Sequence, residues 1–254
     1  YVKELGERTE RGISIMWTGP KVVSREITHE DAELFTLAIR RKPFVWDNYP
    51  VNDYEPSRLL MGPITGRDVE TLVRLEALAS NPMNQAEASK IALGTYADLL
   101  WNAEAYDPQR SWDAAIVHLV GEEALPVMRE FCQQNLWSRH WKEAPPEIAS
   151  AIEEWQKSGD TEPLRSALTR LATLPRRLRQ HITQTELLEE LEPWLWRMEQ
   201  ISKLGLELLD QLEEEALRPA RILTELEAIR NASEAIVCDG WIERWIRETL
   251  EEFA

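Results

Sequence analysis

The segment from Phe44 to Tyr54, with the sequence FVWDNYPVNDY, places polar and aromatic side chains directly after a short apolar run. A run of this kind predicts a buried parallel strand, and the carboxyl ends of such strands form the ligand sites of β/α barrels. There the Trp46 indole offers a flat apolar wall, the Asn48 amide can donate and accept hydrogen bonds, and the Asp53 carboxylate can accept from hydroxyls. These are the groups that a sugar pocket needs.

Each of these residues also has an ordinary structural explanation. Trp46 could be a core tryptophan, and Asn48, Asp53 and Asn81 could each be loop caps or Asx turns. Asp47 is left out of the site, because its side chain should point away from that of Trp46 if the strand continues. The sugar-site interpretation therefore depends on the combination of residues and on their spacing.

The elements that must position these side chains lie in the first 83 residues. We expect strands at 12–17, 44–47 and 59–63, a helix from the N-cap Thr28 to about residue 41, and a helix capped by Asp68 that ends at residue 80. The interval from Ile13 to Phe44 is one βα repeat of the usual size. A parallel sheet of three strands is not a stable domain alone, because its faces must be covered and its edges paired. Residues 1–83 are therefore predicted to be the closing portion of a (β/α)8 TIM-like barrel, with earlier strands on an upstream segment.

The rest of the chain, residues 84–254, is predicted to be an all-helical bundle domain whose role is packing. Helices are expected at 85–101, 111–120, 122–135, 146–157, 162–174, 183–215 and 219–253, the last of them interrupted near Asp239 and Gly240. The long helix at 183–215 carries an apolar stripe made of Leu188, Leu191, Leu195, Met198, Ile201 and Leu208. The fold class is thus α/β followed by all-α, and the long helices would suit a homodimer through the helical domain.

Composition limits the partners. Lys+Arg 29 against Asp+Glu 45 gives a net charge of 29 − 45 = −16, which argues against nucleic acid and anionic membrane. Cys132 and Cys238 are best explained as buried thiols, although the sequence alone does not exclude a disulfide. No metal-ligand spacing is present among the histidines, and neither a metal nor a cofactor is expected. The first residue, Tyr1, is not an initiator Met, so we expect a longer protein; the compartment stays open, with the cytoplasm slightly favoured.

Several spaced motifs carry a family resemblance over roughly residues 1–135. They are Met16–Ser24 (MWTGPKVVS), Trp46–Asn48 with Asn52–Tyr54, Arg58–Pro63 (RLLMGP), Asn81–Pro82, Ala88–Leu93 (ASKIAL), and Tyr106–Pro108 before Ser111–Trp112. In this order they resemble the O-GlcNAcase type β-N-acetylglucosaminidases, glycoside hydrolase family 84. The resemblance implies a retaining hydrolase in which the 2-acetamido oxygen of the sugar attacks the anomeric carbon, an exception to the two-carboxylate scheme.

The resemblance also implies roles for matched residues. Trp46 would wall the acetamide pocket and Asn48 would hydrogen-bond in the acetamide region. Asp53 and Asn81 would hold the ring hydroxyls. Val22 and Tyr54 would form the rim of the pocket.

The main departure from the family pattern concerns catalysis. The family uses two adjacent aspartates, and this sequence contains no adjacent Asp-Asp pair, so no catalytic residue is assigned in this chain. The expected partners are an upstream fragment of the same enzyme and a protein or glycan that bears N-acetylglucosamine. Two alternatives stay open: a non-catalytic helical interaction or dimerisation module, and a hexosaminidase of different substrate preference.

Overall fold

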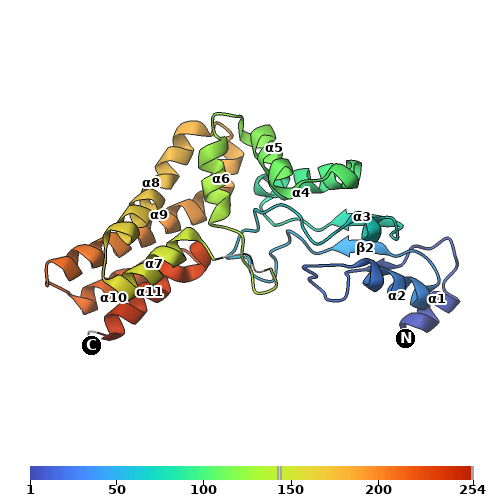
Figure 1. The fold of residues 1–254 in the computed structure, drawn as a ribbon, viewed down its shortest axis with the longest axis horizontal. Helices are drawn as coiled ribbons and strands as arrows, with labels where there is room; N and C mark the ends of the chain where they lie inside the picture. Colours follow the sequence, from blue (N-terminus) through green and yellow to red (C-terminus); the bar gives the residue numbers. More distant parts are fainter. Residues whose placement is uncertain (142, 144, 253–254) are drawn as a thin grey trace. The chain divides into compact units, whose positions relative to one another are not determined.

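The computed structural model describes residues 1–141, 143 and 145–252. The chain forms two compact units (Figure 1). Unit 1 comprises Tyr1–Glu55, Leu60–Leu119 and Ser138–Trp141, and unit 2 comprises Pro56–Leu59, Val120–Trp137 and Lys142–Ala254. The protein is mostly helical and contains one small parallel sheet, which agrees with the predicted fold class at this level of detail.

Unit 1 is built on a three-stranded parallel sheet with the order β1-β2-β3. The strands are β1 (Met16–Trp17), β2 (Phe44–Asp47) and β3 (Ala77–Ser80), and β2 lies in the middle. The register pairs Trp17 with Val45 and Asp47 with Ser80, so the three strands end at one edge of the sheet. This edge is where the sequence predicts the ligand site.

The helix α2 (His29–Ile39) connects β1 to β2, as expected from its N-cap. Thr28 and Asp31 form a capping box, in which each side chain binds the backbone N–H of the other residue. The core of this βαβ unit is apolar and includes Ile27, Ala32, Val45 and Leu75, with Trp17, Leu72 and Leu78 packed against it. A short helix that the sequence did not predict, α1 (Val2–Arg8), packs on α2.

Two expectations for residues 59–80 are wrong. The apolar run at 59–63 is no strand, although Leu60 and Met61 are buried. Side chains satisfy its backbone instead: Trp112 Nε1 donates to the Met61 carbonyl at 2.7 Å, and Tyr49 Oη donates to the Gly62 carbonyl at 2.9 Å. The apolar sequence of residues 59–63 thus correctly predicted that the segment is buried, but not that it forms no strand.

The helix expected up to residue 80 is the single turn α3 (Val69–Leu72), and the chain then forms β3. Asp68 does cap α3, as predicted, by accepting from Thr71 N at 2.7 Å. Leu75 and Leu78, which fit a helical stripe, are buried from a loop and a strand. Pairing with β2 outweighs the local periodicity, as tertiary context commonly does.

Unit 1 also contains helices that cover the buried loop. They are α4 (Ala86–Trp101), the short 3-10 helix η1 (Ala103–Ala105) and most of α5 (Pro108–Val120). Tyr106, between η1 and α5, donates from its hydroxyl to the Ile64 carbonyl at 2.8 Å. Burial raises the pKa of Tyr106 to about 12, so the phenol remains a hydrogen-bond donor at neutral pH.

Unit 2 is all helical among its described residues. Its helices are α6 (Leu125–Gln133), α7 (Glu147–Ser158), α8 (Glu162–His181), α9 (Thr185–Glu213), α10 (Pro219–Ala232), the 3-10 helix η2 (Cys238–Gly240) and α11 (Trp241–Glu252). The predicted helices agree with these bounds to within a few residues, with two exceptions. The break expected near Asp239 and Gly240 extends over residues 233–240, and α8 continues past Pro175 instead of ending at 174. It continues because Leu171, Leu174 and Leu178 remain on one buried face across the proline.

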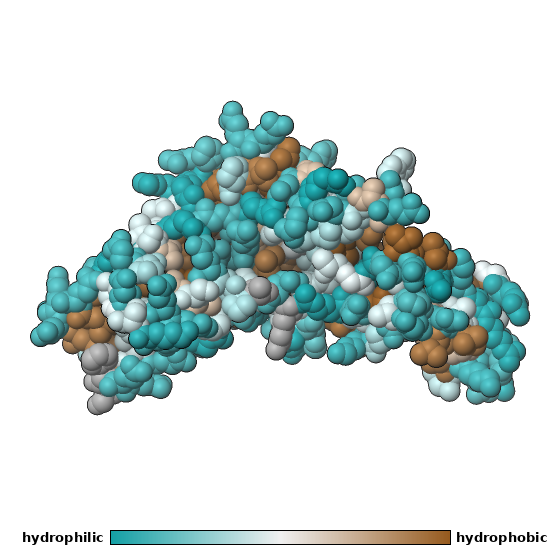
Figure 2. Space-filling view, viewed as in Figure 1, coloured by the Kyte–Doolittle hydropathy of each residue, from teal (hydrophilic) through white to brown (hydrophobic). Residues whose placement is uncertain are grey.

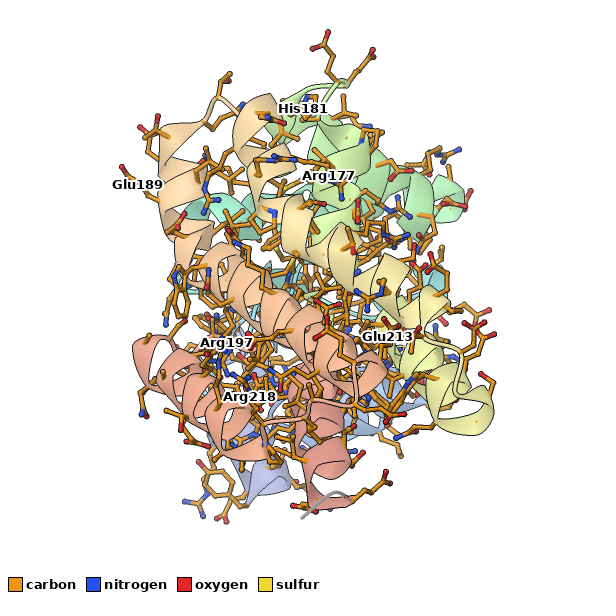
Figure 3. All side chains as sticks on the ribbon, turned by 90° about the vertical axis from the view of Figure 1, so that its left-hand side faces the viewer. Arg177, His181, Glu189, Arg197, Glu213 and Arg218 are labelled. Atoms are coloured by element: carbon orange, nitrogen blue, oxygen red, sulfur yellow. The ribbon has the colours of Figure 1, made fainter. Side chains whose placement is uncertain are left out.

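The helices α8 and α9 lie side by side and bury leucines against each other (Figure 3). Of the predicted stripe on α9, all members are buried except Leu188, whose place is taken by Leu187. Arg197 lies among the helices and is only 3% exposed, whereas Glu189 projects into solvent (Figure 3). No helix of the described residues combines the length and apolarity needed to cross a membrane.

Candidate functional site

The candidate site lies at the carboxyl ends of β2 and β3, and Asn48 is its centre. Asn48 Oδ1 accepts two hydrogen bonds of 3.0 Å each, one from Trp46 Nε1 and one from Asn81 Nδ2. Asn48 Nδ2 donates to the Val22 carbonyl at 2.7 Å. One amide therefore joins four of the residues that the sequence predicts for the site.

The register of the sheet produces this arrangement. The Asn81 backbone N–H donates to the Asp47 carbonyl at 2.8 Å, which extends the β2–β3 pairing by one step beyond Ser80. Asn48 and Asn81 are consequently the first residues after two neighbouring strands. The side chains alternate along β2, so that Trp46 is 40% exposed while Asp47 is 1% exposed.

A cavity of about 440 Å³ opens beside Asn48. Its lining residues are Lys21, Val22, Val23, Asn48, Val51, Asp53, Tyr54 and His140. Four of the predicted site residues, Val22, Asn48, Asp53 and Tyr54, thus share one cavity. Trp46 and Asn81 do not line it and reach it through their hydrogen bonds to Asn48.

Asp53 is free to bind a ligand. Its side chain is exposed and makes no hydrogen bond or ion pair within the described residues. Its neighbour Asn52 is buried and holds the loop, since Asn52 Nδ2 donates to Gln85 Oε1 at 2.8 Å and Asn52 Oδ1 accepts from Asn84 N at 3.1 Å. The carboxylate of Asp53 is therefore presented to the cavity by a fixed loop.

Tyr54 is held by a turn that the sequence did not assign to the site. Its hydroxyl lies 3.0 Å from Ser138 Oγ, its ring packs against His140 at 5.2 Å between centroids, and the Arg139 guanidinium lies 5.4 Å above the ring. Burial raises the pKa of Tyr54, so its hydroxyl stays protonated at neutral pH. His140 lies far from the other site residues in sequence and gave no local signal, so the sequence analysis did not assign it to the site.

Beneath the site, Asp47 forms a buried ion pair with Arg67. Arg67 Nε and Nη2 donate to the two Asp47 carboxylate oxygens at 2.8 Å each, and both side chains are at most 1% exposed. Burial lowers the pKa of Arg67, but the hydrogen bonds and charge of Asp47 outweigh this effect and raise the pKa above its usual value. Asp47 is consequently a structural residue, in line with its exclusion from the predicted site.

Arg67 also fixes the loop that follows β1. It donates to the Ser24 carbonyl at 2.6 Å and to the Arg25 carbonyl at 2.7 Å. This loop contributes Val22 to the Asn48 network and Lys21 to the cavity. The pair was missed from the sequence because Arg67 lies in a segment with no strand or motif around it.

The lining of the cavity offers hydrogen-bond donors and acceptors to a polar ligand. Asp53 is the one carboxylate among its lining residues. A carboxylate, an amide and an exposed indole can bind hydroxyls and a flat apolar group together. Within the described part of the chain, no cluster of three or more His, Cys, Asp or Glu side chains could hold a metal ion.

Comparison with known proteins identifies the family to which this chain belongs. Residues 1–133, more than half of the 254, match the family model NAGidase, described as beta-N-acetylglucosaminidase. The chain therefore belongs to the β-N-acetylglucosaminidase family, of the O-GlcNAcase type, and the resemblance found in its motifs is confirmed.

Individual relatives agree with this assignment. The protein O-GlcNAcases of Rattus norvegicus and Mus musculus are each 43% identical over 97 residues, which is 38% of this chain and 11% of the length of the relative. A solved structure of an O-GlcNAc hydrolase mutant from Thermobaculum terrenum is 28% identical with a TM-score of 0.83, covering 98% of this chain and 57% of that chain. The chain thus spans only a small part of its curated relatives and little more than half of this solved structure.

Proposed function

We propose that this chain is part of a retaining β-N-acetylglucosaminidase that removes terminal β-linked N-acetylglucosamine, including O-GlcNAc on Ser and Thr of proteins. The observation that carries the proposal is the Asn48 network beside a cavity with a free Asp53. In a member of the O-GlcNAcase type family, this arrangement is suited to hold a sugar that bears an acetamide. The reaction would be substrate-assisted, so the acetamide oxygen attacks the anomeric carbon and an oxazoline intermediate forms.

Each residue would contact a different part of the sugar. The exposed face of Trp46 would wall the acetamide. The Asn48 amide has one remaining N–H to donate in the same region, because its other N–H binds the Val22 carbonyl. Asp53 and the side-chain oxygen of Asn81 would accept from ring hydroxyls, and Val22 and Tyr54 would form the rim. Such preorganisation keeps the intramolecular nucleophile close and aligned with the anomeric carbon.

The catalytic proton transfer is proposed to come from outside this chain. We infer that an upstream segment supplies the two adjacent aspartates and the earlier strands, and that residues 1–83 close its (β/α)8 barrel while residues 84–254 form a helical domain. Two features of unit 1 support this inference. The three-stranded sheet leaves the outer edges of β1 and β3 without a strand partner among the described residues. Beside β3 lies an apolar groove of about 310 Å³.

Exposed apolar side chains on unit 1 also support an upstream segment that covers this unit. Large hydrophobic residues that are at least half exposed in unit 1 include Ile13, Met16, Leu34, Leu37, Val73, Leu100 and Trp101. Among the described residues of unit 2, no large hydrophobic side chain is half exposed, and the most exposed is Leu223 at 37%. A surface of this kind on unit 1 is typical of one that another segment covers.

The proposed homodimer through the helical domain remains a prediction, which sedimentation velocity would test.

Replacement of Asp53 tests the proposed function. A preparation that combines this chain with the upstream segment should release the aglycone from an aryl N-acetyl-β-glucosaminide. Asp53→Ala should lower kcat/KM by about 100-fold or more, because two hydroxyl hydrogen bonds to a charged group would be lost at about 1.5–3 kcal/mol each.

The matched control is Asp98→Ala, since Asp98 is an exposed aspartate on α4 that lies outside the cavity. It should leave kcat/KM within about twofold of the unmodified enzyme. Full activity in Asp53→Ala would reject the site assignment, and no hydrolysis by the combined preparation would reject the enzyme itself.

A further inference from the structure

The cavity is bordered by a turn that comes from a distant part of the sequence. Within the Ser138–Trp141 turn, Ser138 N donates to the Trp141 carbonyl at 2.8 Å, and Ser138 Oγ accepts from Trp141 N at 3.0 Å. The His140 N–H also points to Ser138 Oγ, at 3.3 Å. These bonds close the turn on itself, so its shape does not depend on a ligand.

The turn is anchored to unit 1 at both of its ends. Trp141 is 2% exposed and stacks on Tyr49 with 4.1 Å between ring centroids and 24° between ring planes. At the other end, Ser138 bonds the Tyr54 hydroxyl, and Arg139 Nη2 donates to the Tyr54 carbonyl at 3.0 Å. The turn is therefore a rigid part of the cavity wall.

This anchoring leaves the His140 imidazole exposed at the edge of the cavity, together with the Lys21 ammonium. Neither side chain makes a hydrogen bond or ion pair with a described residue; the His140 ring only packs on Tyr54. The other charged groups near them are Arg139, Glu55 and Asp53, and Lys21 also lines a second cavity together with Arg25 and Glu26. Arg139 and Glu55 bind within the loop, where Arg139 N donates to Glu55 Oε2 at 2.8 Å, and Asp53 would be occupied by the sugar.

Two free cationic or donor groups at one rim are unusual in a chain with a net charge of −16. An ammonium and an imidazole donate to a carboxylate or phosphate with charge-assisted hydrogen bonds. The neighbouring lining is apolar and includes Val22, which is 75% exposed, together with Val23 and Val51. The leaving group of a sugar bound at Asn48 and Asp53 would pass this rim.

We propose that Lys21 and His140 form a subsite for an anionic side chain of the polypeptide that carries the sugar. The proposal rests on the proposed function and adds a substrate preference to it: glycosylated Ser or Thr with an acidic or phosphorylated neighbour. The Asp53 carboxylate lines the same cavity and keeps its charge when sugar hydroxyls bind it, so it opposes the anion and reduces the expected preference.

The test compares three synthetic glycopeptides that differ only in the neighbour of the glycosylated Ser, which is Glu, Gln or Lys. With the combined enzyme, kcat/KM should fall in the order Glu, Gln, Lys, by about two- to fivefold per step, as expected for partly exposed ion pairs. The ratio of Glu to Gln peptide should shrink as salt is raised, because ions screen the interaction.

Lys21→Gln and His140→Gln should each bring the ratio of Glu to Gln peptide toward one, whatever their effect on the absolute rates. Lys3→Gln, which removes the same charge from an exposed position on α1, should keep the ratio. A ratio of one or less in the unmodified enzyme, or an unchanged ratio in both rim variants, overturns the subsite. Absence of hydrolysis of the aryl glycoside overturns the proposed function instead, so the two failures are distinguishable.

Discussion

The two units of this chain are stabilised by different kinds of contact. In unit 1, two arginines bind backbone carbonyls of several loops: Arg67 as described above, and Arg41, whose guanidinium donates to the carbonyls of Gly6, Thr9, Glu10 and Ile13 at 2.7–3.0 Å. In unit 2, fully buried leucines on α8 and α9 form the core, and most charged pairs lie at the surface. Unit 1 thus combines its apolar core with these arginine hydrogen bonds, whereas leucine packing predominates in unit 2, where Arg197 is the buried arginine among the described residues.

The difference corresponds to what each unit must do. A binding site needs loops and side chains at fixed positions, and hydrogen bonds with defined geometry provide this. A supporting bundle needs only burial of its apolar faces, which is less directional and tolerates substitution of similar volume. We therefore expect mutations in the polar contacts of unit 1 to affect stability and binding together, and core mutations in unit 2 to affect stability alone.

The largest effect on stability is expected from Arg67→Met. The substitution leaves the Asp47 carboxylate buried without its partner, and breaking a buried pair in this way costs about 3–5 kcal/mol. It also releases the loop of Ser24 and Arg25 that presents Val22 to Asn48. Urea unfolding followed by tryptophan fluorescence measures the loss of stability, and kcat/KM of the combined enzyme measures the loss of positioning.

The double variant Asp47→Leu with Arg67→Met sharpens this test. It removes both charges, so it should recover part of the stability that Arg67→Met loses, while kcat/KM stays low because the loop remains unheld. If kcat/KM recovered together with stability, Arg67 would have no positioning role distinct from its role in the fold.

A core truncation in unit 2 is expected to have the next largest effect. Leu168 on α8 is fully buried and packs close to Gly205 on α9, where an added Cβ would lie 3.1 Å from its side chain. Leu168→Ala should therefore lower the free energy of unfolding by about 2–5 kcal/mol through lost burial and a cavity. Under conditions where the protein stays folded, kcat/KM should be unchanged. A loss of kcat/KM of tenfold or more at full folding would contradict the separation of the two units.

The sequence predicted the elements whose signals are local. The capping box of Thr28 and Asp31, the strand at 44–47 and the stripe on α9 all depend on residues a few positions apart, and each was found. By contrast, β3 was predicted as helix, because Leu75 and Leu78 fit both periods and only pairing with β2 distinguishes them. Local patterns cannot report a partner strand that lies 33 residues away.

The candidate site was predicted in part for the same reason. Trp46, Asn48 and Asp53 lie within one segment, and Val22, Tyr54 and Asn81 came from the family resemblance, so these six could be named. Arg67 and His140 contact the site from segments with no motif of their own. Their contribution depends on tertiary structure, which composition and spacing do not contain.

The smallest effect is expected from Arg179→Met, which repeats the Arg67 substitution at the surface of unit 2. Arg179 on α8 donates from Nη2 to both carboxylate oxygens of Glu192 on α9, at 2.9 and 2.8 Å, but the two side chains are 37% and 52% exposed. Water and salt screen such a pair, and neither charge becomes buried without a partner when the other is removed. Arg179→Met should therefore change the free energy of unfolding by no more than about 1 kcal/mol. The same urea measurement compares it with Arg67→Met, and a similar loss in both variants would show that burial does not distinguish the arginines of the two units.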